Sequence, residues 1–298
     1  MAQGAPQRGI WRRQMNETKT QGAKCSEHST PQHTPDLTGT EIGNNKDYDT
    51  KRRVPKEGND SIPADSVYSH ILNAAQTLFE PSQVVELRAI FKNGRVDSGY
   101  FDDFSLLAEA AAILDRRADI SGIYWTLNPV NPDCLHRAKN HMREWASKNK
   151  GGATTSDAEI LRRRLLFFDF DGANRPAGIS ATRQELEAAK EKAVRVAQFL
   201  AGRKWEAPIA AMSGNGYHLL YKTDMPNDRE SAELVKKCLL SLSLMFDDET
   251  IKIDTSVFNA SRIGKVYGTV AKKGDDTSER SHRRSMLLKT AGEHCANG

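Results

Sequence analysis

Cysteine is scarce and scattered in this sequence. Its four cysteines, Cys25, Cys134, Cys238 and Cys295, lie far apart with no paired spacing. That distribution excludes a cysteine-rich zinc module and gives no sign of a disulfide framework. We therefore expect no zinc site.

Long apolar stretches are absent as well. No run of about eighteen apolar residues occurs, and the N-terminus lacks the apolar core of a signal peptide. We therefore expect a cytoplasmic protein with no membrane partner.

Apolar residues are few overall, at 38% of 298 residues, whereas charged residues reach 28%. Part of so polar a chain is expected to stay unpacked. Residues 1–60 show neither helical nor strand periodicity and are predicted to be a disordered polar arm, with 291–298 a short tail. The net charge of +4 permits a nucleic-acid partner without requiring one.

Helical and strand patterns alternate through the rest of the chain, which indicates an α/β (α+β) fold. A helix over 104–114 is expected to begin at a cap on Asp102 or Asp103, and another follows the capping box Thr182–Glu185 and stops at Gly202. Further helices are predicted over 67–79, 230–246 and from Asn131-Pro132 to about Lys148, and strands over 84–91, 99–101, 123–127, 165–171, 209–212 and 251–254.

The run Leu165–Gly172 is the most informative stretch, because apolar residues lead into two acids and a turn. Side chains alternate along a strand, so Asp169 and Asp171 share one face while Phe168 and Phe170 point to the other. At ~5 Å and an effective dielectric of ~20, the two carboxylates would repel by roughly 3 kcal/mol. A divalent cation or protonation of one acid would relieve this repulsion. The simpler alternative is a strand end with two solvated acids.

The second informative stretch is Ser213–His218. Gly214 and Gly216 allow a tight loop whose backbone amides can approach an anion, and the Ser213 hydroxyl adds a donor. His218 then opens the next strand, where its imidazole can donate to a phosphate oxygen. Taken singly, such a glycine pair is usually a turn and such a histidine usually structural.

The third stretch places one acid, Asp254, before two cations, Arg262 and Lys265. A metal site beside a phosphate site would need this composition, although a surface loop of mixed charge would share it. A phosphate-binding P-loop is excluded, because position 259 is Asn259 rather than glycine and position 266 is Val266 rather than serine or threonine.

In this order, Asp169-Phe170-Asp171, Ser213–His218 and Asp254 with Arg262 resemble the motifs of the archaeo-eukaryotic primase superfamily. The pattern is most similar to the primase-polymerase domains of plasmids, phages and other mobile elements. The resemblance implies an N-terminal α/β module over 61–160, packed on a catalytic sheet shaped like an RNA-recognition motif over 161–290. The active site would lie between them.

The resemblance also implies roles for individual residues. Two Mg²⁺ or Mn²⁺ ions would be held by three acids, and the triphosphate of the incoming nucleotide would be contacted by the glycine loop, the histidine and two cations. Weaker contacts to nucleic acid would come from the basic segment near the C-terminus, where Ser281 stands in place of an expected proline. The residues are Asp169, Asp171 and Asp254 for metal, Ser213, Gly214, Gly216, His218, Arg262 and Lys265 for nucleotide, and Lys272, Lys273 and Arg283 for nucleic acid.

The sequence thus predicts a metal-dependent primase or DNA polymerase, a nucleotidyltransferase that uses nucleoside triphosphates on a single-stranded DNA template in replication of a mobile element. A separate replicative helicase is a candidate partner. Two alternatives stay open. Phe168–Gly172 also resembles the first motif of haloacid-dehalogenase-type phosphatases, with Asp247-Asp248 as their late acidic pair. A replication-initiator protein that binds DNA without catalysis is the other.

Overall fold

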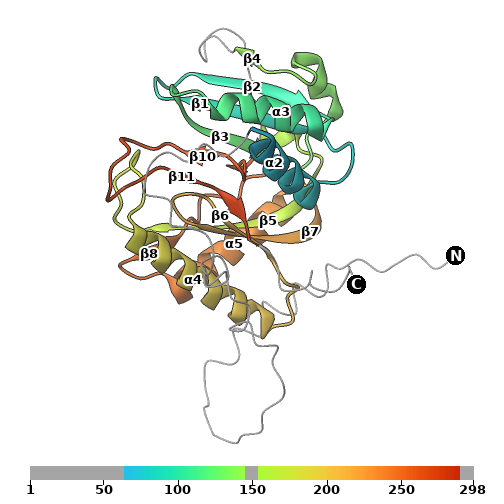
Figure 1. Cartoon of the computed structure of the whole chain (residues 1–298). Helices are drawn as coiled ribbons and strands as arrows, with labels where there is room; N and C mark the ends of the chain where they lie inside the picture. The colour runs from blue at the N-terminus through green and yellow to red at the C-terminus, as the bar shows by residue number, and fades with distance from the viewer. Residues whose placement is uncertain (1–63, 145–153, 289–298) are drawn as a thin grey trace, which may run out of the picture.

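The computed structural model describes residues 64–144 and 154–288, so the predicted arm over 1–60 and the tail over 291–298 lie outside the described residues. Figure 1 shows two layers, an upper one containing α2 and α3 and a lower one resting on α4 and α5. Within the described ranges, no helix combines the length and apolar character needed to span a membrane.

The upper layer is a five-stranded antiparallel sheet in the order β4-β2-β1-β3-β9, packed against two helices. The helix predicted over 104–114 is confirmed, and Asp103 is its cap, since the Asp103 carboxylate accepts the N–H groups of Ser105 and Leu106 at 2.8 and 3.2 Å. The predicted strands here are confirmed as well. The elements are α2 (Ala64–Leu78), β1 (Val85–Phe91), β2 (Val96–Phe101), α3 (Phe104–Asp115) and β3 (Ile120–Thr126).

The helix predicted from Asn131-Pro132 to about Lys148 is wrong. A short 3-10 helix, η1 (Pro132–Arg137), is followed by a two-residue strand, β4 (Arg143–Glu144). The chain between them bonds to β2: Tyr100 N–H donates to Ala138 O at 2.9 Å, and Asn140 N–H donates to Tyr100 O at 2.7 Å. Asn140 has φ of 55°, a left-handed conformation that ends any helix. Hydrogen bonding to strand β2 therefore outweighed the local signal for a helix at Asn131-Pro132.

The lower layer follows a β-α-β-β-α-β order along the chain. Its sheet has the order β12-β6-β7-β5-β8 and is antiparallel. The capping box on Thr182 and Glu185 starts α4 as predicted. The elements are β5 (Arg162–Gly172), α4 (Arg183–Ala201), β6 (Ile209–Met212), β7 (Tyr217–Pro226), α5 (Arg229–Phe246), β8 (Ile251–Ile253) and β12 (Met286–Leu287).

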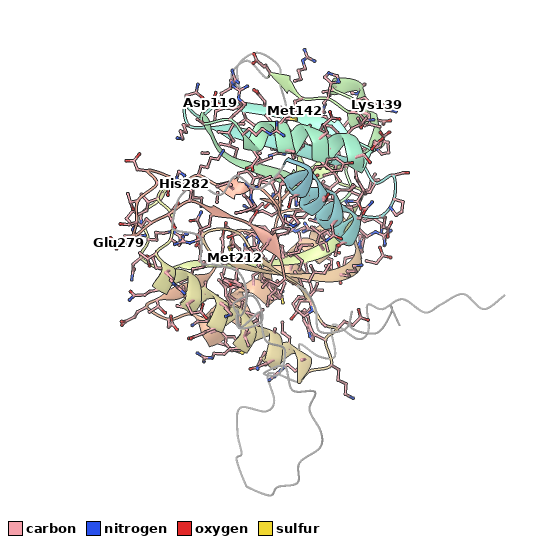
Figure 2. The ribbon with its side chains drawn as sticks, viewed as in Figure 1. Asp119, Lys139, Met142, Met212, Glu279 and His282 are labelled. Carbon is pink, nitrogen blue, oxygen red and sulfur yellow. The ribbon has the colours of Figure 1, made fainter. Side chains whose placement is uncertain are left out.

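Strand β5 lies inside this sheet, between β7 and β8. Phe168 and Phe170 are fully buried, and the Phe168 ring packs against Trp205 and Tyr221. Figure 2 shows side chains filling the space between the layers, with Met142 labelled in the upper one and Met212 in the lower. The phenylalanines therefore anchor the strand that carries the acids, as the alternation of side chains predicts.

One segment of the predicted second module returns to the upper layer. Strand β9 (Ile263–Lys265) pairs with β3, with Lys265 opposite Tyr124 and Ile263 opposite Thr126. The chain therefore crosses from β8 in the lower sheet to β9 in the upper one. A further two-stranded sheet, β10 (Val270–Ala271) with β11 (Arg283–Arg284), follows.

Candidate active site

A pocket lies between the two sheets, where the acid end of β5 faces β9. Its lower side is formed by Asp169, Asp171 and His218, and its upper side includes Arg262 and Lys265. Tyr124, Ser213 and Lys273 also line it. The structure thus brings residues from all three sequence stretches to one place.

The paired acids differ in their electrostatics. Burial and the negative charge of Asp169 raise the pKa of Asp171 above its ordinary value, and Arg175 opposes this shift. Burial alone would raise the pKa of Asp169, but the hydrogen bond of His218 and the positive charge of its protonated ring lower it below its ordinary value. The repulsion expected from the sequence is therefore present, and Asp171 is the acid that takes up a proton more readily.

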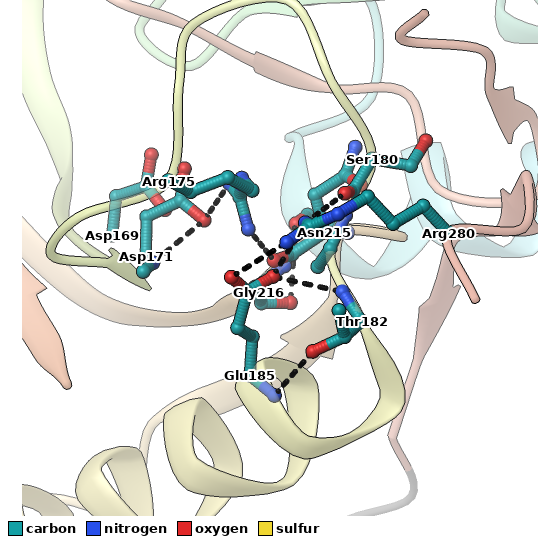
Figure 3. Close-up of polar contacts among 12 residues, drawn as sticks. Asp169, Asp171, Arg175, Ser180, Thr182, Glu185, Asn215, Gly216 and Arg280 are labelled. Atoms are coloured by element: carbon teal, nitrogen blue, oxygen red, sulfur yellow. Dashed lines mark hydrogen bonds and ion pairs between the residues drawn. The ribbon is translucent and has the colours of Figure 1, made fainter. Parts of the chain in front are cut away.

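Arg175 is a site residue that sequence reasoning missed. Its guanidinium pairs with the Asp171 carboxylate and donates to the Asn215 carbonyl at 2.9 Å, with only 4% of its side chain exposed. Figure 3 shows Arg175 between Asp171 and the loop of Asn215 and Gly216. Its position four residues after Asp171, beyond a predicted turn, is the signal that could have found it.

The loop Ser213–His218, which the sequence predicts to bind phosphate, lines the pocket with Ser213 and Asn215 and makes hydrogen bonds within itself. The Ser213 hydroxyl oxygen accepts the N–H groups of Asn215 and Gly216 at 3.3 and 3.0 Å, and Gly214 N–H contacts the Met212 sulfur at 2.9 Å. A Cβ on Gly216 would lie 2.2 Å from the Phe170 carbonyl oxygen. This glycine is therefore required by the close approach of β5.

His218 lies directly across the sheet from Asp169 in the β5–β7 register. Its Nε2 is 3.4 Å from Asp169 Oδ1, and its Nδ1 is 2.7 Å from the Tyr267 hydroxyl. The imidazole is buried at the edge of the pocket. Tyr267 was not predicted, and the sequence carries no signal for it, because only the crossing of the chain to the upper layer brings it here.

The third predicted acid lies beside the pair without joining it. Asp254 N–H donates to Asp169 O at 2.9 Å, but the Asp254 carboxylate accepts Ser256 N–H at 2.8 Å and does not line the pocket. Among the described residues, no three His, Cys, Asp or Glu side chains are grouped to hold a metal ion. The Asp254 carboxylate therefore does not join Asp169 and Asp171 in lining the pocket, and its role as a metal ligand stays a prediction. The hard oxygens and mutual repulsion of Asp169 and Asp171 alone fit a divalent cation.

Both cations on the basic side of the pocket donate to main-chain oxygens, and Arg262 also donates to the Asn259 side chain at 2.9 Å. Arg262 Nη2 donates to Ser256 O at 2.8 Å, and Lys265 Nζ donates to Val270 O at 3.0 Å. Lys265 is 4% exposed, and burial lowers its pKa to about 7. Its charge near neutral pH therefore depends on what occupies the pocket.

The three predicted nucleic-acid contacts divide into two kinds. Lys272 Nζ donates to the carbonyl oxygens of Asp115 and Arg117, and Arg283 Nη1 donates to Ala181 O. These two cations bind the protein's own main chain. Lys273 lines the pocket instead, where its charge acts on both Asp169 and Asp171.

The late acidic pair that a phosphatase would need is used elsewhere. Asp247 accepts Ile253 N–H at 2.9 Å, and Asp248 pairs with the buried Lys192. Neither acid lines the pocket. A phosphatase of the haloacid-dehalogenase type with Asp169 as its first acid would therefore lack its second acidic motif in this pocket.

Comparison with protein-family models and with curated proteins gives no match for this chain. Among solved structures, it is similar to the polymerase domain of Mycobacterium tuberculosis Ligase D in complex with DNA, with 14% identity and a TM-score of 0.41 over 74% of this chain and 80% of the other. A likeness this slight assigns neither a family nor an activity.

Proposed function

We propose that this chain is a metal-dependent nucleotidyltransferase that adds nucleotides on a single-stranded DNA template, as a primase or DNA polymerase of a mobile element. The observation that supports it is the single pocket in which Asp169, Asp171 and His218 face Arg262 and Lys265. The carboxylates that would bind a metal ion and the basic side chains that would bind a phosphate thus lie on opposite sides of the same pocket.

The basic side of the pocket suits a triphosphate. Two carboxylates alone would repel it, whereas Arg262, Lys265 and Lys273 supply compensating positive charge. Approach of a phosphate favours the protonated form of Lys265, because a nearby anion stabilises an ammonium group. When no phosphate is bound, Lys265 can lose its proton near neutral pH.

The acid side suits divalent cations held by Asp169 and Asp171. When bound, Mg²⁺ or Mn²⁺ supplies activation of a 3′-hydroxyl and stabilisation of the departing pyrophosphate. Asp254 is proposed as a further ligand because its backbone lies one hydrogen bond from Asp169. His218, whose Nε2 lies at the edge of the pocket beside Asp169, would donate a hydrogen bond to a phosphate oxygen bound there.

The architecture is compatible with the remaining parts of the proposal. The β-α-β-β-α-β order of the lower layer would suit a sheet shaped like an RNA-recognition motif, on which the acids occupy the face opposite the phenylalanines. A single-stranded template would be gripped by charge and by stacking, largely independent of its sequence. A separate replicative helicase would supply that single strand.

The direct test is incubation of the protein with single-stranded DNA, labelled ribo- or deoxynucleoside triphosphates and Mn²⁺ or Mg²⁺, with and without an annealed primer. We expect incorporation by the wild type. Asp169→Ala combined with Asp171→Ala should lower it by about 10³-fold or more, since several kcal/mol of charge stabilisation are lost. Binding of single-stranded DNA in a gel-shift assay should largely persist.

A matched control removes two acids far from the pocket. Glu191 and Glu206 are exposed on the lower layer, so Glu191→Ala combined with Glu206→Ala should leave incorporation unchanged. If the wild type binds DNA but incorporates nothing with either metal, the replication-initiator alternative is correct instead.

A further inference from the structure

We propose that Tyr267 is a positioning residue that keeps the proton of neutral His218 on Nε2, so that the imidazole N–H faces Asp169 and the pocket. The kinetic part of this inference rests on the proposed function. Its structural part does not, because the position of a proton on a histidine can be measured in the free protein.

The geometry around the imidazole leaves it little freedom. Its Nδ1 is 2.7 Å from the Tyr267 hydroxyl, and its Nε2 is 3.4 Å from Asp169 Oδ1. The ring meets Phe167 edge-on at 4.7 Å between centroids and lies 5.8 Å from the Tyr267 ring. His218 is therefore held between two aromatic rings, with one nitrogen toward each polar partner.

Tyr267 is itself rigidly placed. It is 1% exposed and follows β9 in the segment that returns to the upper layer. Its ring packs edge-on against the fully buried Trp125, with centroids 6.1 Å apart. Burial and the charge of Asp169 raise the pKa of the Tyr267 phenol well above its ordinary value, so the hydroxyl keeps its proton.

The donors and acceptors fit one arrangement. An ionised carboxylate can only accept a hydrogen bond, so Asp169, at the longer distance of 3.4 Å, favours a proton on the nitrogen that faces it. In a neutral imidazole the other nitrogen is then an acceptor, and the Tyr267 hydroxyl is the donor beside it. Tyr267 O–H, His218 and Asp169 thus form a chain in which every proton has an acceptor.

The tautomer of His218 with its proton on Nδ1 would lose these hydrogen bonds. With the proton on Nδ1, the Nε2 lone pair would face the carboxylate of Asp169, and the hydroxyl hydrogen of Tyr267 would have no acceptor among the described residues. A buried donor left without a partner is costly. Without the tyrosine hydroxyl this penalty disappears, which leaves only the 3.4 Å contact with Asp169 to favour the proton on Nε2 and makes the Nδ1 tautomer more accessible.

The structural test is the nitrogen-15 NMR spectrum of the histidine rings in the full-length protein. His218→Asn assigns the signal by its loss. In the wild type at a pH where His218 is neutral, we expect a protonated Nε2 and an unprotonated Nδ1. A wild-type signal with the proton on Nδ1 would overturn the inference whatever the variants do.

Tyr267→Phe removes the hydroxyl and should shift the His218 signal toward a mixture of tautomers. Tyr221→Phe is the matched control, because Tyr221 is buried on the same strand as His218 and its hydroxyl has no hydrogen-bond partner among the described residues. That control should leave the signal unchanged. Identical His218 spectra for Tyr267→Phe and the wild type would contradict the inference.

The kinetic test compares nucleotide incorporation. Tyr267→Phe should lower kcat/KM by about fivefold to tenfold, the effect of one hydrogen bond, and should have no further effect in a His218→Ala background. A loss of equal size in both backgrounds would mean that Tyr267 acts independently of His218 and would overturn the inference. If the wild type incorporates nothing, the proposed function fails, while the NMR result still decides the role of Tyr267.

Discussion

The two sides of the pocket are built in different ways. On the acid side, Asp169 and His218 face each other because β5 and β7 are neighbouring strands in register. On the basic side, Arg262 and Lys265 arrive only because the chain leaves the lower sheet after β8 and pairs with β3 of the upper one. Sheet register builds the first side, and a crossing between layers builds the second.

The polar contacts differ in the same way. The acid-side residues bind other side chains, as Asp171 binds Arg175 and Asp169 faces His218. Each basic-side residue donates to a main-chain oxygen, Arg262 to Ser256 and Lys265 to Val270, and Arg262 also donates to the Asn259 side chain at 2.9 Å. Changes on the acid side should therefore spread through the sheet, whereas changes on the basic side should act mainly through charge.

The largest effect is expected from Gly216→Ala, which breaks the acid side. The new Cβ would lie 2.2 Å from the Phe170 carbonyl oxygen, so the backbone of β5 or β7 must shift. We expect the free energy of unfolding to fall by about 3 kcal/mol or more, measured by urea denaturation.

Gly202→Ala is the control for that variant. Gly202 ends α4 in right-handed helical geometry, and an added Cβ would meet nothing closer than 3.6 Å. Stability should change by less than about 1 kcal/mol, in the stabilising direction. Equal losses for the two variants would contradict the close-approach explanation of Gly216.

A smaller, pH-dependent effect is expected from Lys265→Met on the basic side. Burial lowers the folded pKa of Lys265 to about 7, while the unfolded value is about 10.4. Between these pH values the unfolded state binds more protons, so wild-type stability rises with pH. At pH 6 the variant should be more stable by about 1–2 kcal/mol, and this advantage should shrink by pH 9.

Urea denaturation across that pH range measures the effect, with Lys222→Met as the control. Lys222 is exposed on β7, so its removal should give a pH profile parallel to that of the wild type. A parallel profile for Lys265→Met would mean that the buried ammonium is not destabilised.

The smallest effects should separate two adjacent lysines of the basic segment. Lys272→Met loses hydrogen bonds to the carbonyls of Asp115 and Arg117 and should cost about 1–2 kcal/mol of stability. Lys273→Met should change stability by less than about 0.5 kcal/mol but weaken nucleotide binding by about fivefold at low salt. Denaturation and titration with a labelled nucleotide measure the two effects, and the reverse pattern would contradict the division.

Local patterns predicted the elements whose cause is local. Asp103 caps α3 and Thr182 caps α4, as their spacing indicates. The helix expected after Asn131 did not form, because this segment makes backbone hydrogen bonds to Tyr100 of β2 instead. A partner so distant in the sequence cannot be predicted from the neighbouring residues. The sequence predicts an anion site at the glycine loop, and its contacts to Ser213 were visible only in the structure: the N–H groups of Asn215 and Gly216 donate to the Ser213 hydroxyl.

By itself, the sequence determined that Asp169 and Asp171 share one face of a buried strand, because alternation along a strand is a property of the backbone. It also supplied the acidic and basic residues that line the pocket. Tertiary structure alone decided that Tyr267 and Lys265 lie over His218 and Tyr124, that Arg175 neutralises Asp171, and that the Asp254 carboxylate turns to Ser256. These placements depend on how two sheets pack and where the chain crosses between them, and such long-range contacts leave no periodic trace in the sequence.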